Sequence, residues 1–256
     1  MVKKFNHFIF LLLISFSIAS ILISCGGSDD EEYEWEWDDE DSGNSDNAKK
    51  PKFIWVDAAA NFPDFANSKE NILRDLTLAQ ETGFTDVVVD VCPTSGDVLF
   101  KSSAGTEVKW LGAWLPAGYT KIERTATWDY LQAFIDAGHS LGLKIHAGVN
   151  TFSGGNTTSL GSEGLLFRET AKREWATQLL TESGIVSTMD QSTNGAKFFN
   201  PVNEDVQNYV CDLLEDLAAY KDLDGIILDR ARFDELHSDF SNYTNCLLYT
   251  SPSPRD

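Results

Sequence analysis

Polar side chains stand at the ends of four apolar segments in this 256-residue sequence. The segments 53–56, 87–91, 144–149 and 225–228 end at or beside Asp57, Asp90, Asn150 and Asp229. Each apolar segment has the length and composition of a buried strand. Enzymes built on a barrel of parallel strands place their catalytic and binding groups at the carboxyl ends of those strands. We therefore take these four residues as the centre of a candidate site.

Helix-like segments separate the four expected strands and decide which strand ends can meet. Helical spacing of apolar residues is found near 68–82, 128–141 and 202–220, and a loop rich in Gly, Asn and Ser is expected after the third strand. This alternation predicts βαβ units and a parallel sheet. No glycine-rich nucleotide turn follows the first strand, so a (β/α)8 barrel is favoured over a small open sheet. The expected fold class is α/β, with about the first half of a TIM barrel present.

The expected barrel domain covers residues 51–245. A complete barrel of this kind takes about 250 residues, whereas this region has four expected strands. The segment 246–256 has neither strand nor helix periodicity and differs in composition from the residues before it. We expect it to be a non-native tail, with a genuine disordered terminus as the alternative. The domain would then be the N-terminal part of a barrel that continues with other residues.

Four segments of the sequence resemble those of a known family. They are the segments 53–62, 85–91, 199–201 and 224–233. In this order they resemble the glycosyl hydrolase-like 10 group of bacterial lipoproteins, which are often described as alpha-amylase family proteins. The resemblance covers about residues 52–243. It implies a (β/α)8 barrel, a glycosidase activity with an unspecified substrate, and a carbohydrate as the binding partner.

The resemblance implies a catalytic role for Asp229. Glycoside hydrolysis uses one carboxyl group that donates a proton and a second that acts as nucleophile or activates water. Asp229 is expected in the second role, because apolar strand residues hold it in place and Arg230 or Arg232 can keep it ionised by charge pairing. Alternatively, Asp229 is a solvated strand end that pairs with Arg232. The proton donor is expected from a later strand, after Asn245.

Further residues near the strand ends are expected to bind the substrate: Asp57, Asp90, His146, Asn150, Arg230, Arg232, Trp110 and Trp114. Asp57 and Asp90 either bind sugar hydroxyls or stabilise the barrel rim by hydrogen bonds. His146 lies within a strand, where a core histidine with a satisfied partner is the alternative to a ligand. Trp110 and Trp114 either stack on sugar rings or close the top of the barrel.

Several other kinds of chemistry have no support in the residue pattern. No cluster of His, Asp and Glu has convincing metal-ligand spacing, so neither a metal nor another cofactor is expected. The serine elbow G-x-S-x-G is missing, and clustered basic charge is missing too, so nucleic acid is not an expected partner. A metal-dependent barrel deacetylase is disfavoured because the ligand cluster is missing. The main rival to a glycosidase is a non-catalytic glycan-binding lipoprotein.

The N-terminal residues predict export and lipid anchoring. Two lysines precede the apolar run 8–23, which is shorter than the about 20 residues that a membrane span needs. The run ends at Leu22-Ile23-Ser24-Cys25, which resembles a lipobox. This resemblance implies that residues 1–24 are a signal peptide and that Cys25 carries the lipid. An ordinary secretory signal is the alternative.

Residues 25–50 are expected to form a disordered tether after the lipidated cysteine. Eleven carboxylates lie between Asp29 and Asp46, before the first basic residue at Lys49, and such a segment cannot build a core. Without these acids and the two leader lysines, the formal net charge of −20 becomes −11. The acidic start resembles the surface-export signal of Bacteroidetes lipoproteins and implies a cell-surface protein anchored in the outer membrane. Residues 33–37 form a short strand or docking patch in the alternative interpretation.

Overall fold

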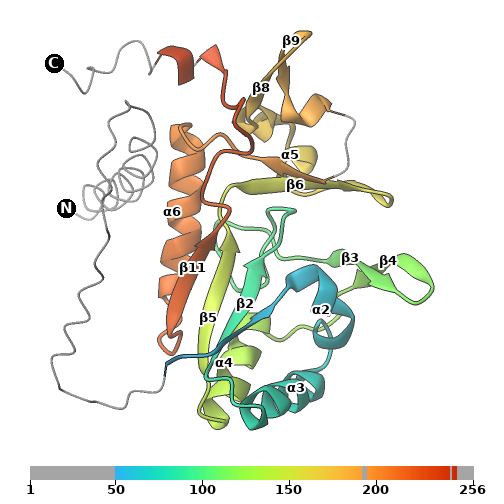
Figure 1. Ribbon diagram of the computed structural model, residues 1–256, viewed down its shortest axis with the longest axis vertical. Coiled ribbons are helices and arrows are strands. Elements are labelled where there is room, and N and C mark those ends of the chain that lie inside the picture. The colour runs from blue at the N-terminus through green and yellow to red at the C-terminus, as the bar shows by residue number, and fades with distance from the viewer. Residues whose placement is uncertain (1–49, 192–194, 243, 247–256) are drawn as a thin grey trace, which may run out of the picture. The chain divides into compact units, whose positions relative to one another are not determined.

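A computed structural model shows a parallel sheet with helices packed against it (Figure 1). The structure describes residues 50–191, 195–242 and 244–246. The predicted signal peptide, Cys25, the acidic tether up to residue 49 and residues 247–256 of the predicted tail lie outside the described residues. Within the described ranges, no helix combines the length and the apolar character needed to cross a membrane.

Four parallel strands form the main sheet in the order β1, β2, β5, β11. Their bounds are Phe53–Val56 for β1, Asp86–Cys92 for β2, Lys144–Asn150 for β5 and Gly225–Asp229 for β11. The α/β class with a parallel sheet is therefore confirmed, and the strands are the four that the apolar runs predict. Closure into an eight-stranded barrel stays a prediction.

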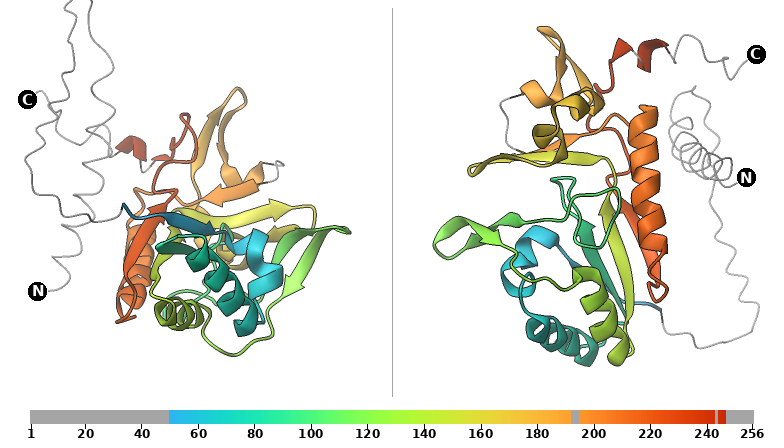
Figure 2. Two further views of the ribbon diagram at one scale, coloured as in Figure 1. Left: turned by 60° about the horizontal axis from the view of Figure 1, so that its bottom comes forward. Right: turned by 180° about the vertical axis from the view of Figure 1, so that it is seen from behind.

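Three long helices pack on one face of this sheet, as the view from behind shows (Figure 2). They are α3 (Lys69–Glu81), α4 (Tyr130–Ser140) and α6 (Glu204–Ala218). Alternate strand residues are fully buried in this layer, including Val87, Val89, Ile145 and Ala147. A fully buried valine or isoleucine side chain stabilises the fold by about 1.5 to 3 kcal/mol. This layer is the hydrophobic core of the sheet.

A short helix that the sequence pattern did not predict follows β1 directly. This helix, α2 (Ala58–Phe65), begins at Asp57, whose Oδ1 accepts a hydrogen bond of 2.7 Å from the Ala60 amide. An aspartate in this N-cap position satisfies an amide that has no partner within the helix. The strand end therefore passes into a helix without an intervening loop.

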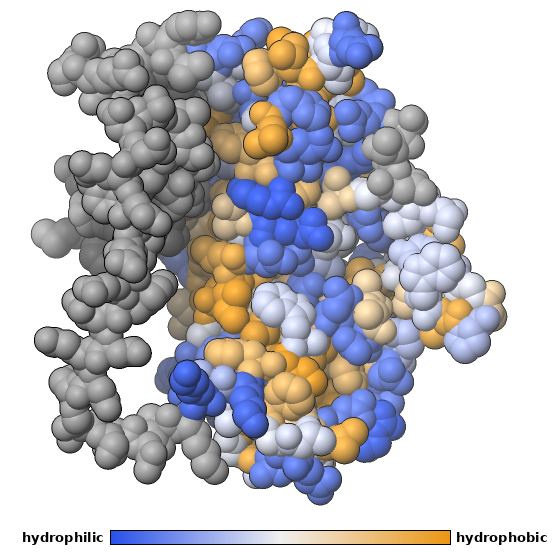
Figure 3. Space-filling view, in the orientation of Figure 1, coloured by the Kyte–Doolittle hydropathy of each residue, from blue (hydrophilic) through white to orange (hydrophobic). Residues whose placement is uncertain are grey.

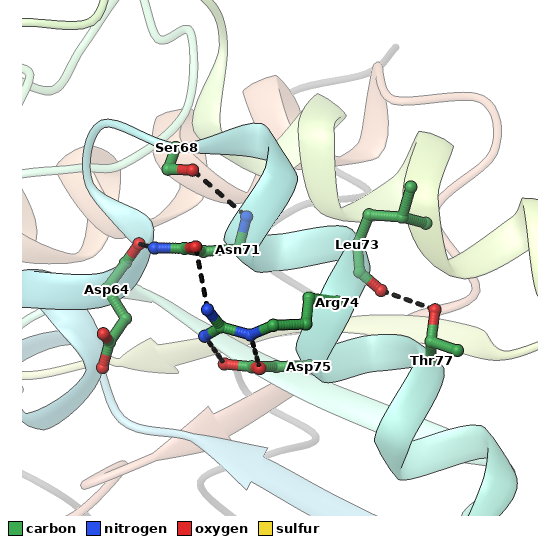
Figure 4. A network of polar contacts seen from close by, with 7 residues as sticks. All are labelled: Asp64, Ser68, Asn71, Leu73, Arg74, Asp75 and Thr77. Atoms are coloured by element: carbon green, nitrogen blue, oxygen red, sulfur yellow. Dashed lines mark hydrogen bonds and ion pairs between the residues drawn. The ribbon is translucent and has the colours of Figure 1, made fainter.

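Side-chain hydrogen bonds hold the start of α3 against the end of α2 (Figure 4). Ser68 caps α3 by accepting a hydrogen bond of 3.1 Å from the Asn71 amide. Asn71 Nδ2 donates to the carbonyl of Asp64 at 2.9 Å, and Arg74 Nη1 donates to Asn71 Oδ1 at 3.0 Å. The contact between the two helices is thus set by polar groups at their ends.

Antiparallel strands occupy the long connections between the main strands. A hairpin of β3 (Trp110–Leu115) and β4 (Gly118–Glu123) follows β2. After β5 the chain forms an antiparallel sheet of β6 (Ser153–Thr158), β7 (Gly161–Glu163) and β10 (Gly195–Phe198). A second hairpin consists of β8 (Gln178–Thr181) and β9 (Gly184–Ser187). The same connection contains the helix α5 (Leu165–Arg168) and 3-10 helices at Thr170–Trp175 and Thr188–Asp190.

The expectation of a loop after the third strand is therefore wrong. The glycines and the asparagine of β6 have weak strand propensity, but tertiary packing overrides it. Gly154 of β6 lies against the ring of Phe199, and a Cβ at this glycine would overlap that ring. The glycine that indicates a loop in the sequence is a packing position in a strand.

The opposite face of the main sheet is only partly covered. Phe53 and Trp55 of β1 are 50% and 46% exposed, and apolar side chains gather over the sheet on the face seen in Figure 3. Among the described strands, β1 pairs only with β2 and β11 pairs only with β5. Both outer edges of the main sheet therefore have no partner strand within the described residues.

Candidate functional site

The carboxyl ends of the four main strands bring the predicted residues to one end of the sheet. In the strand register, Asp229 lies opposite Asn150, and Asp90 lies opposite Gly148, two residues before Asn150. Because the strands are parallel and adjacent, their ends share one rim, which is the position of catalytic sites in parallel barrels. The rim is the group Asp57, Asp90, Asn150, Asp229 and Arg230.

A chain of hydrogen bonds links three strands at this rim. Asn150 Nδ2 lies 3.2 Å from both carboxyl oxygens of Asp90 and donates to the Cys92 carbonyl at 2.8 Å. The other end of the same amide, Oδ1, accepts a hydrogen bond of 2.8 Å from Arg230 Nε. Asn150 therefore holds Arg230 in position through a group that is itself fixed by β2.

The carboxyl group of Asp90 is buried, and its pKa is raised. Only 6% of the residue is exposed. Burial and the nearby charge of Asp57 raise the pKa of Asp90 to about 7, against the opposing effect of hydrogen bonds from the Ala58 and Cys92 amides and from Asn150. Perturbed pKa values of this kind are enriched at functional sites, although structural networks produce them too.

Asp57 and Tyr130 flank Asp90. The side chain of Asp57 is used as the cap of α2 and the residue is exposed. The hydroxyl of Tyr130 is buried and has no hydrogen-bond partner among the described residues, and burial together with Asp90 raises its pKa. Sequence reasoning missed Tyr130, because it reads as one more apolar position of the helix that starts there.

Asp229 is exposed at the end of β11 and is oriented by the backbone. Its Oδ1 accepts a hydrogen bond of 2.7 Å from the amide of Arg230, whose backbone adopts the left-handed conformation with φ of 49°. The expected charge pairing with arginine is wrong: neither Arg230 nor Arg232 forms an ion pair with Asp229 in the described structure. The guanidinium of Arg232 instead donates to the carbonyls of Phe233 and Asp234.

Both arginines that follow β11 lie over one aromatic ring. The guanidinium carbons of Arg230 and Arg232 are 5.9 and 5.6 Å from the ring centroid of Phe198 in β10. At this separation a guanidinium is attracted to the face of the ring. The antiparallel sheet after β5 therefore helps to position the cationic side of the rim.

His146 lies inside the main sheet and is not at the rim. Its Nε2 is 2.9 Å from Asp86 Oδ1, and the side chains of His146 and Asp86 are 14% and 7% exposed. The ring also lies 5.4 Å from that of Phe53. A hydrogen-bonded core histidine, one of the two interpretations of the sequence, describes this position. Asp86 was missed, although it occupies the same strand face as Asp90.

The two tryptophans predicted to bind sugar are not brought together with Asp229. Trp110 and Trp114 belong to the β3–β4 hairpin. This hairpin extends from the side of the molecule away from β11, as the views from the front and from behind both show (Figures 1 and 2). Trp114 is 79% exposed and lies 5.3 Å from the ring of Tyr119. Trp110 lines a separate pocket on this side.

No group of three or more His, Cys, Asp and Glu side chains within the described ranges has the arrangement of a metal site. The polar groups that the rim does offer are carboxyl groups, an amide and a guanidinium group. Such a set binds hydroxyl groups by hydrogen bonds and positions a carboxylate for reaction.

Comparison with known proteins gives partial matches. No family model matches the sequence. The chain is 32% identical over 197 residues to an S-layer-related protein of Niallia circulans; the match covers 76% of this chain, which spans only 12% of the length of that relative.

Solved structures match this chain over part of their own length. Alpha-L-fucosidase isoenzyme 2 from Paenibacillus thiaminolyticus matches with a TM-score of 0.50 and 17% identity, over 80% of this chain and 27% of that one. An alpha-amylase from Lactobacillus plantarum matches with a TM-score of 0.42 and 18% identity, over 71% and 38% of the two chains. The match to the fucosidase shows that the described residues share part of its fold.

Proposed function

We propose that this chain is part of a glycoside hydrolase that acts on an extracellular poly- or oligosaccharide, with Asp229 as nucleophile or base. One observation carries the proposal: the parallel strands place an exposed carboxylate, Asp229, beside a hydrogen-bonded set of Asp90, Asn150 and Arg230 at one rim. The fold shared with a fucosidase is consistent with this interpretation. A TIM barrel, of which these strands form about half, would supply the remaining wall of the site.

We assign a different role to each residue of the rim. Asp229 is the strand-end carboxylate that is exposed and not used as a helix cap, and the Arg230 amide fixes the position of its Oδ1. Asn150 is buried and holds Arg230 in position, and we assign to Arg230 the binding of sugar hydroxyls next to that carboxylate. Asp90 is buried behind Asn150, so we assign it a positioning role.

The exchange Asp229→Asn tests the catalytic assignment. We expect release of reducing sugar from a glycan panel by the complete gene product to fall at least about a hundredfold, because an amide cannot act as nucleophile or base. Asp136→Asn, which makes the same change at an exposed position of α4, serves as the control and should leave turnover intact. Equal turnover by the parent protein and by Asp229→Asn would contradict the assignment.

A non-catalytic glycan-binding protein is the second candidate. Of the other two strand-end carboxylates, Asp57 caps α2 and Asp90 is buried, so neither is free to donate a proton to an exposed substrate. This function predicts that the parent protein binds glycans without turnover and that Asp229→Asn retains the binding. Measured turnover by the parent protein excludes it.

We also propose that the protein is displayed on the cell surface by a lipid on Cys25. The lipobox-like sequence supports this, and the name of the S-layer-related relative points to a surface protein as well. Cys25→Ser is expected to abolish incorporation of labelled palmitate in a producing bacterium, whereas Cys211→Ser should leave it unchanged. Full labelling of Cys25→Ser would refute the anchor.

A further inference from the structure

A pocket lies apart from the strand-end rim, between the β3 region and the β7–α5 segment. Its volume is about 350 Å³, within the range of small-molecule sites. The β3–β4 hairpin, whose Trp110 lines the pocket, extends on the side of the molecule away from β11 (Figures 1 and 2). The side chains that matter for its chemistry come from three parts of the chain and are Asp97, Lys109, Trp110, Glu163, Phe167 and Arg168.

One wall of the pocket is held by a charged pair with two hydrogen bonds. Arg168 donates to Asp97 through Nη2 at 2.6 Å and through Nη1 at 3.2 Å. The side chain of Asp97 is 15% exposed and that of Arg168 is 40% exposed. The two parallel hydrogen bonds between an arginine and a carboxylate are directional, so they fix the shape of this wall. The Arg168 side chain lines the pocket and is partly exposed, so a ligand can reach it.

Glu163 supplies a carboxylate that the surrounding protein does not occupy. It is partly buried at the end of β7, and no hydrogen bond or ion pair from the described residues reaches its carboxyl oxygens. Burial and the neighbouring charge of Asp97 raise the pKa of Glu163 to about 7, against the opposing effect of the Lys121 charge. A partly buried carboxyl group without a partner costs free energy that a ligand hydroxyl can recover.

Aromatic surface completes the lining. Trp110 is partly buried, and Lys121 Nζ lies 4.8 Å from its ring centroid, which holds the ring in place. Phe167 packs against Gly155, where a Cβ would come within 3.0 Å of the Phe167 ring. The pocket therefore combines fixed aromatic surface with both a hydrogen-bond acceptor, Glu163, and donors from Lys109 and Arg168.

We propose that this pocket is a second, non-catalytic binding site for a neutral sugar unit. A sugar presents apolar C–H faces for the aromatic rings, hydroxyl donors for Glu163 and oxygen acceptors for Arg168. A cationic ligand fits less well because Lys109 and Arg168 line the same pocket, and an anion is disfavoured by Asp97 and Glu163. The inference does not depend on Asp229 being catalytic.

Calorimetric titration of the protein with maltose, cellobiose, lactose and melibiose at millimolar concentration tests the proposal. We expect at least one disaccharide to bind, with affinity about tenfold or more weaker in Glu163→Gln, because the exchange replaces the carboxyl group with an amide and keeps the side-chain shape. Trp110→Phe should weaken the same binding. Thermal melts establish whether both variants are folded. If Trp110→Phe is unfolded, the affinity of Glu163→Gln alone tests the proposal.

Two matched variants separate this pocket from other sites. Trp114→Phe changes an exposed tryptophan of the same hairpin and should leave the affinity unchanged, and so should Asp229→Asn at the rim. Binding of no disaccharide, or equal binding by the parent protein and Glu163→Gln, would overturn the proposal. Stronger binding of choline chloride than of every sugar would overturn it too, in favour of a cation site. Loss of turnover in Asp229→Asn with sugar binding retained would support both proposals separately.

Discussion

Gly164→Ala is expected to lower the free energy of unfolding by about 3 kcal/mol or more. Gly164 has a φ of 102°, a conformation that residues with a Cβ rarely adopt, and an added Cβ would overlap the carbonyl oxygen of Ser95. The overlapping atom belongs to the backbone, and that same carbonyl accepts a hydrogen bond of 3.1 Å from the Leu165 amide. The β7–α5 segment therefore cannot move away without losing its attachment to the loop after β2. Chemical denaturation measures the effect.

Gly161→Ala is the matched control for this prediction. Gly161 has a similar φ of 114°, but nothing lies within 4 Å of the position its Cβ would take. The control should cost only the conformational strain of about 1 to 2 kcal/mol. Equal destabilisation by the two variants would show that the close approach to Ser95 contributes nothing. The difference in unfolding free energy between the two variants measures how closely the β7–α5 segment packs against the loop after β2.

Asp90→Asn is expected to change how stability depends on pH. The folded pKa of about 7 lies above the ordinary value of 3.8, so between these pH values the folded state binds more protons at Asp90 than the unfolded state does. Stability contributed by this group therefore falls as pH rises from about 4 to about 7, in total by about 4 kcal/mol. The amide introduced by Asp90→Asn does not titrate, so the variant should lack this loss.

The measurement is the difference in unfolding free energy between Asp90→Asn and the parent protein across this pH range. Groups that do not interact with Asp90 contribute equally to both proteins, including Asp86, whose pKa is lowered, and Glu163, whose pKa is raised, and their effects cancel in the difference. We expect the variant to gain relative stability as pH rises toward 7. Parallel stability curves would mean that Asp90 titrates normally in the folded protein.

The main sheet could be predicted from sequence because its strands are continuous apolar runs. The segment 87–91 shows this well, since all its residues are buried and no other element type suits such a short run. The same rule failed at β6, where Gly154 and Gly155 are required by the close approach of Phe199 and Phe167. Only the partner side chains, which are distant in sequence, reveal that these glycines belong to a strand.

The candidate site was predicted in part, for a similar reason. Strand ends located Asp90, Asn150 and Asp229, because parallel strands share a rim whatever their loops do. Side-chain pairing was not predictable: Arg230 adjoins Asp229 in sequence, yet its guanidinium turns to Asn150. The pocket beside the β3–β4 hairpin is lined by residues from separate connections of the chain, and no local sequence pattern indicates that these connections pack together.

The outer edges of the main sheet bear on how this protein can be produced in the laboratory. An edge strand without a partner offers free backbone groups to any other strand that meets it. Here β1 carries half-exposed Phe53 and Trp55, so recruitment at that edge would also bury apolar surface. We expect soluble yield to depend on what occupies these edges, and an expression strategy that supplies additional strands should reduce aggregation during refolding.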